Sequence, residues 1–291
     1  MAFDPFDHRV ALDLPLRITK AAAWVEHIPF GMTLIDLLRP RMLVELGTFW
    51  GDSYCAFCQA VAKLKTGTRC MAVDTWQGDP HTGDYAGLFE DLRAHHDPLY
   101  GSFSMLKQTT FDQAAKEVPD ESVDLLHIDG LHTYEAVRQD FETWLPKVSD
   151  RGVVLFHDTA ERGGDFGVWK LWEEVVRRFP SFQFPHSHGL GVLMVGPAVP
   201  EAVRNFMTEA SQDPRRIALI YHVLGQRVAL HKTSQALLKN VFAALQSINE
   251  QRRAVGLPVD PNTQSFDVVQ QYPSDFAEFL QSEVERLCKP K

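Results

Sequence analysis

The chain has 291 residues, of which 45% are hydrophobic, and its formal net charge is −9 at pH 7. This length is enough for one or two domains with a substantial core, and the negative charge argues against a duplex nucleic-acid binder, which needs basic side chains to neutralise phosphates. No apolar run approaches the roughly 20 residues of a membrane-spanning helix, and the first residues lack the basic start and apolar core of a signal peptide. We therefore expect a cytoplasmic protein without a membrane span.

Helical and strand-like patterns alternate along the first two thirds of the chain. Residues 18–38 have a helical pattern that is interrupted at Pro29 and ends at Arg39-Pro40. Short apolar runs predict seven strands, at 42–46, 70–74, 103–107, 123–128, 152–156, 182–184 and 192–195. Helical patterns accompany the first five strands, at 53–65, 110–117, 133–145 and 168–178. The last two strands are joined by a turn short enough for an antiparallel pair. This order predicts an α/β fold with a doubly wound, seven-stranded, mostly parallel sheet.

Two regions are longer than the sheet and its connecting helices require. Residues 76–101 are too long for a plain connection between the second and third strands, and we expect them to form a lid or a substrate wall. Beyond Pro200 the pattern is helical, with a break at 256–264 before a last helix near 273–288. The predicted organisation is an N-terminal helical segment, a sheet domain and a C-terminal helical extension, with bounds 1–40, 41–199 and 200–291.

The sequence Leu-Val-Glu-Leu-Gly-Thr-Phe-Trp-Gly-Asp-Ser at 43–53 predicts a buried strand, a glycine-rich turn and the start of a helix. Gly47 and Gly51 let the backbone approach a ligand closely. Glu45 places a carboxylate where phosphates would be repelled, so the cofactor should be cationic or neutral. The dinucleotide fingerprint G-x-G-x-x-G is absent. S-adenosylmethionine, which carries a sulfonium and an ammonium group, fits this turn.

Asp74 ends the second predicted strand and can accept hydrogen bonds from both ribose hydroxyls of an adenosine. An NAD enzyme would use the same residue, so an NAD-linked oxidoreductase is an alternative, disfavoured by the missing fingerprint. Asp129 and Asp158 end the fourth and fifth strands, at neighbouring tips of the sheet. Two carboxylates there form a plausible site for Mg²⁺ or another divalent cation, which would orient a substrate hydroxyl and lower its pKa. In the alternative, Asp129 caps a helix and Asp158 pairs with Arg162.

Three segments carry a family resemblance: Glu-Leu-Gly-x-x-x-Gly-x-Ser at 45–53, Val-Asp-Leu-Leu-His-Ile-Asp at 123–129 and Gly-Val-Val-Leu-Phe-His-Asp-Thr at 152–159. They resemble class I S-adenosylmethionine-dependent O-methyltransferases of the catechol type, and bacterial members found with antibiotic-sugar and polysaccharide pathways. The likeness covers roughly residues 40–195. It implies a Rossmann-like fold and methyl transfer to a hydroxyl of a sugar or small secondary metabolite.

The resemblance also implies roles for individual residues. The cofactor site would comprise Glu45, Gly47, Thr48, Gly51, Ser53, Asp74, Thr75, Trp76, Gln108, Thr109, Thr110 and Asp129. Asp129 and Asp158 match metal-ligand positions, and Thr159, with His157 as a substitute, falls where the catechol-type enzymes have an asparagine ligand. His132 falls where those enzymes place a lysine general base, and an imidazole with a pKa of about 6.5 can do that work.

Several alternatives stay open at this stage. The chain could be a metal-independent methyltransferase with His132 as its base, or a non-catalytic methyltransferase-like protein that binds partners through residues 200–291. The expected partner is a small-molecule or saccharide acceptor rather than nucleic acid, and the C-terminal helices could form a homo-oligomer. Other histidines rank below His132 as site residues: His81, His95, His96, His186 and His188. Four aromatic residues could stack on a sugar or on adenine: Trp50, Trp76, Tyr85 and Trp169.

Overall fold

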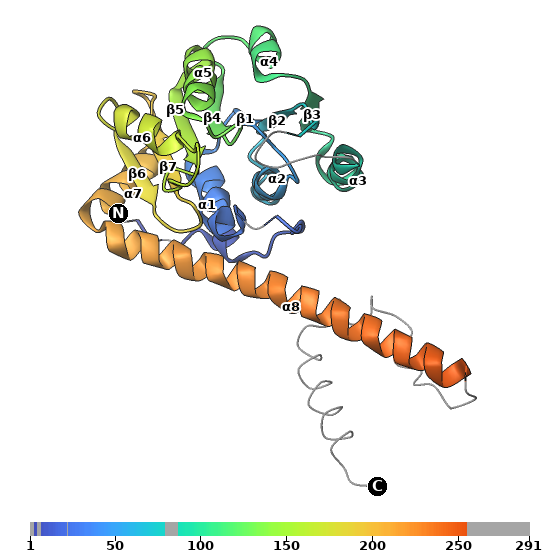
Figure 1. Ribbon diagram of the computed structural model, residues 1–291. Coiled ribbons are helices and arrows are strands. Elements are labelled where there is room, and N and C mark those ends of the chain that lie inside the picture. Colours follow the sequence, from blue (N-terminus) through green and yellow to red (C-terminus); the bar gives the residue numbers. More distant parts are fainter. Residues whose placement is uncertain (1–2, 5–6, 22, 79–86, 255–291) are drawn as a thin grey trace. The chain divides into compact units, whose positions relative to one another are not determined.

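The computed structural model describes residues 3–4, 7–21, 23–78 and 87–254 (Figure 1). Contacts divide the chain into two compact units, Met1–Ala229 and Leu230–Lys291. The first unit contains the sheet and the helices that cover it. Predictions for residues 79–86 and 255–291, which include His81, Tyr85 and the helix near 273–288, lie outside the described residues.

A seven-stranded sheet runs through the first unit in the order β3-β2-β1-β4-β5-β7-β6. Its strands are β1 Met42–Leu46, β2 Arg69–Asp74, β3 Ser104–Gln108, β4 Val123–Ile128, β5 Val148–His157, β6 Ser181–Phe184 and β7 Leu190–Met194. The first five strands pair in parallel, and β7 runs antiparallel to both β5 and β6. This is the strand order of the class I methyltransferase fold, so the predicted fold class is confirmed.

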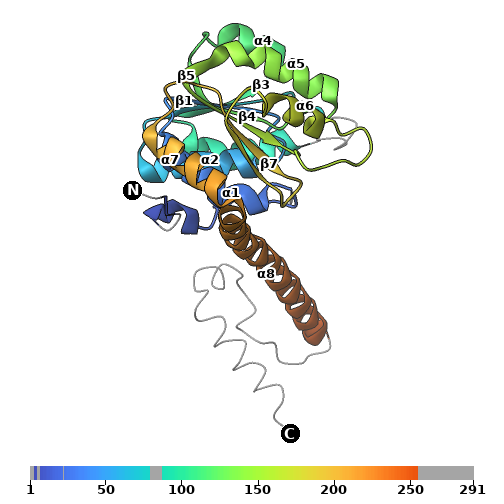
Figure 2. The same cartoon turned by 90° about the vertical axis from the view of Figure 1, so that its left-hand side faces the viewer.

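Helices cover both faces of the sheet (Figure 2). Successive strand residues point to opposite faces: Leu43 and Leu125 belong to one hydrophobic core, and Val44 and Leu126 belong to the other. The first core also contains residues of α1 Ile28–Leu38, α2 Asp52–Leu64, α3 Leu88–Tyr100 and α7 Glu201–Gln212. The second contains residues of α4 Phe111–Glu117, α5 Tyr134–Trp144 and α6 Val168–Val175. The described residues of this unit also form three short 3₁₀ segments: η2 Arg9–Leu12, η3 Val25–His27 and η4 Leu145–Lys147.

The N-terminal helix is shorter than the pattern over 18–38 predicts. It starts at Ile28, after η3, and Pro29 lies in its first turn. A proline is tolerated there because the amide it lacks would have no partner within the helix. The prediction that Pro29 interrupts the helix is therefore wrong: the proline helps to start it. The helix ends at Leu38 and is capped by Arg39, whose φ of 44° is left-handed, just before Pro40.

The helical pattern beyond Pro200 corresponds to α7 and to α8 Pro214–Ala254. Apolar side chains of α7 and of the first part of α8, such as Phe206, Ile217, Tyr221 and Val228, are buried in the core of the first unit. The compact unit therefore extends to Ala229, past the boundary expected at 199. Within the described part of the chain, no helix combines the length and the apolar character needed to cross a bilayer.

Candidate functional site

A cavity of about 570 Å³ lies at the carboxyl ends of the parallel strands. Its wall consists mainly of residues that follow β1 to β5: Ala23, Gly47, Phe49, Asp74, Thr75, Gly78, Thr110, Phe111, Asp129, Gly130, Leu131, His132, His157, Asp158, Glu161, Phe166 and His188. β1 lies between β2 and β4, so the strand order reverses at this point. Open α/β sheets bind their ligands in the crevice at such a reversal.

The turn after β1 leaves no room for a side chain at its first glycine. Gly47 has φ +83°, and a Cβ there would lie 2.1 Å from the carbonyl oxygen of Asp129. The Gly47 amide donates to the Val73 carbonyl oxygen at 3.0 Å, and the Asp129 amide donates to the Leu46 carbonyl oxygen at 2.8 Å. The tips of β1, β2 and β4 are thus tied together directly beside the cavity.

Asp74 holds the same turn from the second strand. One of its carboxylate oxygens, Oδ2, accepts hydrogen bonds from the amides of Thr48 and Phe49, both at 2.9 Å. The other, Oδ1, accepts from the Trp76 amide at 2.8 Å. A carboxylate offers about four acceptor positions, so these three hydrogen bonds leave about one position for a ribose hydroxyl. The sequence predicted that Asp74 would accept hydrogen bonds from both ribose hydroxyls.

Glu45 lies beneath the turn and not on the cavity wall. Its side chain is fully buried, and Oε2 is 2.8 Å from His127 Nδ1. The Trp24 indole donates to the other ring nitrogen of His127 at 3.1 Å, so Nδ1 carries the proton and donates it to Glu45. Burial raises the pKa of Glu45, against the effect of this histidine. Glu45 therefore contributes to a buried hydrogen-bonded row that supports β1.

Two aspartates and two histidines meet at the tips of β4 and β5. His132 Nε2 lies 2.9 Å from Asp158 Oδ2 and 3.6 Å from Asp129 Oδ1. His157 Nδ1 lies 3.2 Å from Asp129 Oδ1 and 3.3 Å from Asp158 Oδ2. Asp158 has a left-handed φ of 59°, an uncommon conformation for a residue other than glycine. The structure thus brings together the residues that the sequence placed at neighbouring strand tips.

The charges in this cluster shift each other's pKa values. Burial disfavours protonated His132, but hydrogen bonds to Asp129 and Asp158 and the charges of both outweigh it and raise the pKa of His132 to about 9. The pKa of His157 is raised in the same way. Burial alone would raise the pKa of the Asp129 and Asp158 carboxyls, but His157 and His132 outweigh it and hold both below the usual range. Near pH 7 His132 therefore keeps its proton and cannot accept another. We expected His132 to act as a general base with an ordinary imidazole pKa. It can do so only if another positive charge takes the place of its proton beside the two carboxylates.

The donor set suits a divalent cation. One ligand atom from each of Asp129, His132 and Asp158 lies within 4.8 Å of the others. Carboxylate oxygens are the preferred ligands of Mg²⁺ and Mn²⁺, and imidazole is accepted by several transition metals. The Thr159 hydroxyl accepts a hydrogen bond from Gln183 at 3.0 Å and, among the described residues, is not part of the cavity wall.

The far wall of the cavity comes from the loop after β5 and from the β6–β7 turn. The Phe166 ring stacks on His132, with centroids 4.8 Å apart and an interplanar angle of 8°. Glu161 pairs with His188 at 2.9 Å. No motif in the sequence points to Phe166 or Glu161, and His188 is one of the histidines that rank below His132. The positions of Glu161 and Phe166 depend on how the loop after β5 folds back, which it does through a bridge between Thr133 and Phe166.

Other predicted residues lie beside the cavity. Thr48, Gly51 and Ser53 are buried in the turn and in the start of α2. Trp76 is buried and donates from its indole to the Phe49 carbonyl oxygen at 3.1 Å. Gln108 and Thr109 make local hydrogen bonds with Thr75 and Gln113. The aromatic rings on the described wall are Phe49, Phe111 and Phe166, whereas Trp50 and Trp169 lie over lysine or arginine side chains.

The chain is similar to several proteins of known structure. One is the O-methyltransferase TomG from Streptomyces achromogenes, involved in tomaymycin synthesis and solved with S-adenosylmethionine: identity is 14%, 62% of this chain and 92% of that chain are covered, and the TM-score is 0.45. Another is an O-methyltransferase from Bacillus cereus in complex with S-adenosylhomocysteine: identity is 12%, coverage is 65% and 88%, and the TM-score is 0.45. Likenesses this distant identify no substrate.

Sequence comparison gives closer matches. The chain is 42% identical over 246 residues to the protein y4gI of Sinorhizobium fredii, and the match covers 84% of this chain and 27% of that protein. The chain therefore spans about a quarter of the length of this relative. Residues 44–159 match a family model described as a methyltransferase domain. That segment runs from β1 to the residues just after β5 and includes the glycine turn, Asp74, Asp129 and Asp158. Residues 44–159 are therefore a methyltransferase domain.

Proposed function

We propose that this chain is an S-adenosylmethionine-dependent O-methyltransferase that acts on a hydroxyl of a sugar or another small secondary metabolite. The observation that carries the proposal is the meeting of Asp129 and Asp158 at one cavity with the glycine turn of a methyltransferase domain. The sequence resemblance to O-methyltransferases of antibiotic-sugar and polysaccharide pathways supports the choice of acceptor.

The cofactor would lie along the tips of β1, β2 and β4. Gly47, Asp74, Thr75 and Asp129 line the cavity there, and the remaining acceptor position of Asp74 would bind one ribose hydroxyl. Glu45 would act from beneath, by holding the strand that carries the turn. Thr110 and Phe111 border the same cavity after β3 and would contact the adenine. S-adenosylmethionine, when bound, supplies the activated methyl group.

Asp129, Asp158 and His132 would hold a divalent cation, Mg²⁺ or another. His132 takes the third place that the resemblance assigned to Thr159, because its Nε2 lies between the two carboxylates while the Thr159 hydroxyl is bound to Gln183. A cation at this position would supply positive charge that orients the acceptor hydroxyl and lowers its pKa.

The remaining wall residues would position the acceptor. Methyl transfer requires the acceptor oxygen, the methyl carbon and the sulfur to be collinear, so holding the acceptor in place is the main task of the protein. Phe166 keeps His132 in place by stacking on it. Leu131 and Phe166 form apolar wall beside polar Glu161 and His188, a combination suited to a sugar ring and its hydroxyls.

Binding of S-adenosylhomocysteine tests the cofactor assignment. Isothermal titration calorimetry of the purified protein should show one equivalent of S-adenosylhomocysteine bound and no comparable binding of NAD. Tighter binding of NAD would favour the oxidoreductase alternative. Failure to bind either compound, in protein with a cooperative thermal transition, would favour the non-catalytic alternative.

The metal-independent alternative also has an observation in its favour, because Asp158 could orient His132 as a base at 2.9 Å. Methylation of a panel of sugars and small phenols should stop in excess chelator and recover when Mg²⁺ or Mn²⁺ is added. Full turnover in chelator that rises with pH through about 9, the pKa of His132, would instead identify this histidine as a metal-free base.

A homo-oligomer through the C-terminal helices is part of the proposal. In the second unit, Leu230, Leu237 and Val241 of α8 are large apolar side chains that are 64%, 63% and 41% exposed. Their spacing of seven and four residues places them along one side of the helix, as in the contact stripe of a coiled coil. A second copy of the same helix would cover them.

A further inference from the structure

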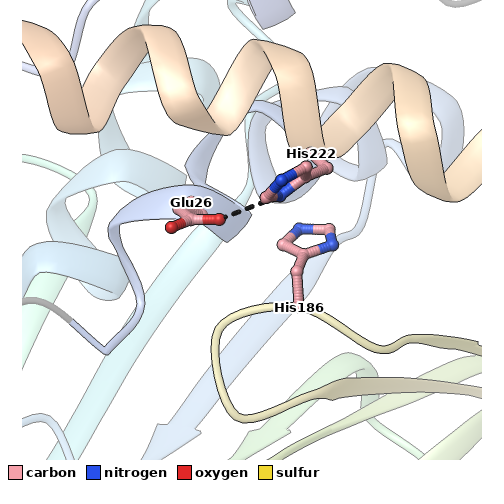
Figure 3. Close-up of side chains that lie close together, drawn as sticks. All are labelled: Glu26, His186 and His222. Carbon is pink, nitrogen blue, oxygen red and sulfur yellow. Dashed lines mark hydrogen bonds and ion pairs between the residues drawn. The ribbon is translucent and has the colours of Figure 1, made fainter.

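A second group of metal-ligating side chains lies outside the cavity, within the first unit. Glu26 comes from η3, His186 from the turn between β6 and β7, and His222 from α8. One ligand atom of each lies within 4.8 Å of the others. Figure 3 shows the two imidazoles and the carboxylate pointing toward one another, and His222 Nδ1 lies 3.1 Å from Glu26 Oε2.

The ion pair between Glu26 and His222, together with a hydrogen bond between His186 and the Glu26 backbone, leaves one ring nitrogen of His186 without a partner in the described part of the chain. His186 Nε2 is buried and, among the described residues, has no hydrogen-bond partner. A buried nitrogen without a partner is destabilising, and this one lies beside a second imidazole and a carboxylate. Burial lowers the pKa of His186 to about 4; the ring is therefore neutral near pH 7 and has a lone pair available.

The surrounding packing brings the three elements close together. At Gly225, three residues after His222, a Cβ would lie 2.2 Å from the Glu26 carbonyl oxygen, so only glycine lets α8 approach η3 this closely. The turn that carries His186 continues through Ser187, His188 and Gly189, all with left-handed φ. His188, two residues after His186, lines the cavity.

This group is separate from the cluster at the strand tips. The ring of His27 lies between them, with its centroid 4.8 Å from that of His186 and 5.6 Å from that of His157. Neither group shares a ligand with the other. The two donor sets also differ: the strand-tip group has two carboxylates, whereas this group has two imidazoles and one carboxylate.

We propose that Glu26, His186 and His222 form a zinc site that fastens α8 to η3 and to the β6–β7 turn. Two histidines and one glutamate hold Zn²⁺ in other zinc proteins, where water takes the fourth position, and a water would complete this site in the same way. Zinc–ligand bonds of about 2.0–2.2 Å require the ligand atoms to close in somewhat, and rotation of the partly exposed Glu26 and His222 side chains, 20% and 41% accessible, permits this. The site would hold the turn that presents His188 to the cavity.

Zinc binding to the full chain tests the site. The variant Asp129→Asn/Asp158→Asn removes the other candidate metal group and serves as the background, after treatment with chelator and dialysis. Calorimetric titration with ZnCl₂ should then show one equivalent bound. Adding His186→Gln or His222→Gln should weaken the affinity for zinc by about 10- to 100-fold or more. Losing a residue that only hydrogen-bonds to a metal ligand already costs about 10- to 100-fold. His231→Gln, a histidine on the same helix outside the group, is the matched control and should leave the affinity unchanged.

Cobalt provides a second readout that does not depend on activity. In the same background, Co²⁺ should give visible absorption bands, and these should disappear in His186→Gln and His222→Gln but persist in His231→Gln. Glu26→Gln, which keeps the size of the side chain, guards against loss of binding through misfolding, and circular dichroism checks each variant. Absence of zinc binding in the folded background, or an affinity in the three ligand variants equal to that of the background, would overturn the proposal.

Discussion

At the scale of single residues, Asp74 has two tasks: it organises the turn after β1 and faces the cavity. Asp74→Ala should weaken binding of S-adenosylhomocysteine by about 1.5–3 kcal/mol, because a charged acceptor is lost. It should also lower stability, since the amides of Thr48 and Phe49 lose their partner. Calorimetry and thermal unfolding measure the two effects, with Asp120→Ala, an exposed acid in a turn, as the control. Unchanged affinity in folded Asp74→Ala would contradict the assignment.

His132 should make the stability of the cation-free protein depend on pH. Its pKa is about 9 in the folded chain and about 6.5 when unfolded, so its contribution is complete below pH of about 6.5 and is lost as pH rises through about 9. Thermal unfolding in chelator from pH 6 to 10 should therefore show a falling Tm in this range. His132→Gln should reduce the slope, leaving the part due to His157, whose pKa is raised in the same direction. Equal slopes in His132→Gln and in the parent chain would refute this reading, and His231→Gln is the control.

At the scale of elements, the approach of the β1–α2 turn to the tip of β4 depends on Gly47. Gly47→Ala should destabilise the protein by more than Gly67→Ala. Both positions have left-handed φ, which costs about 1–2 kcal/mol for alanine, but a Cβ at Gly67 meets nothing within 4 Å, whereas one at Gly47 lies 2.1 Å from Asp129. The difference between the free energies of unfolding of the two variants, measured in urea, separates the effect of the Cβ clash at Gly47 from the backbone strain common to both. Only Gly47→Ala should also lose S-adenosylhomocysteine binding, and equal losses of stability would show that the turn can move away from β4.

At the scale of the whole molecule, the described buried side chains of α8 end at Val228, and the first compact unit ends at Ala229. A chain ending at residue 229 should therefore keep a Tm close to that of the full chain and should still bind S-adenosylhomocysteine. Sedimentation analysis should show self-association of the full chain and not of the shortened one, because Leu230, Leu237 and Val241 are removed. Identical sedimentation behaviour would exclude the C-terminal helices as the oligomer contact.

The sequence by itself determined the order of strands and helices along the chain and the position of two aspartates at the strand tips. These features follow from local patterns: apolar runs set the strands, and an acid directly after a parallel strand must lie at the carboxyl edge of the sheet. The placement of Asp129 and Asp158 side by side needed only the adjacency of β4 and β5. The predicted start of the first helix is wrong because the effect of Pro29 depends on whether helical residues precede it.

Only the tertiary structure decided which partners those side chains meet. Glu45 is turned to His127 and not to the cavity because β1 and β4 pair in a register that sets the two side by side. His132 lies between the aspartates because the loop after β5 folds back and stacks Phe166 on it. Glu26, His186 and His222 come from three distant parts of the chain. Their meeting depends on the packing of α8, a non-local contact that no periodicity in the sequence encodes.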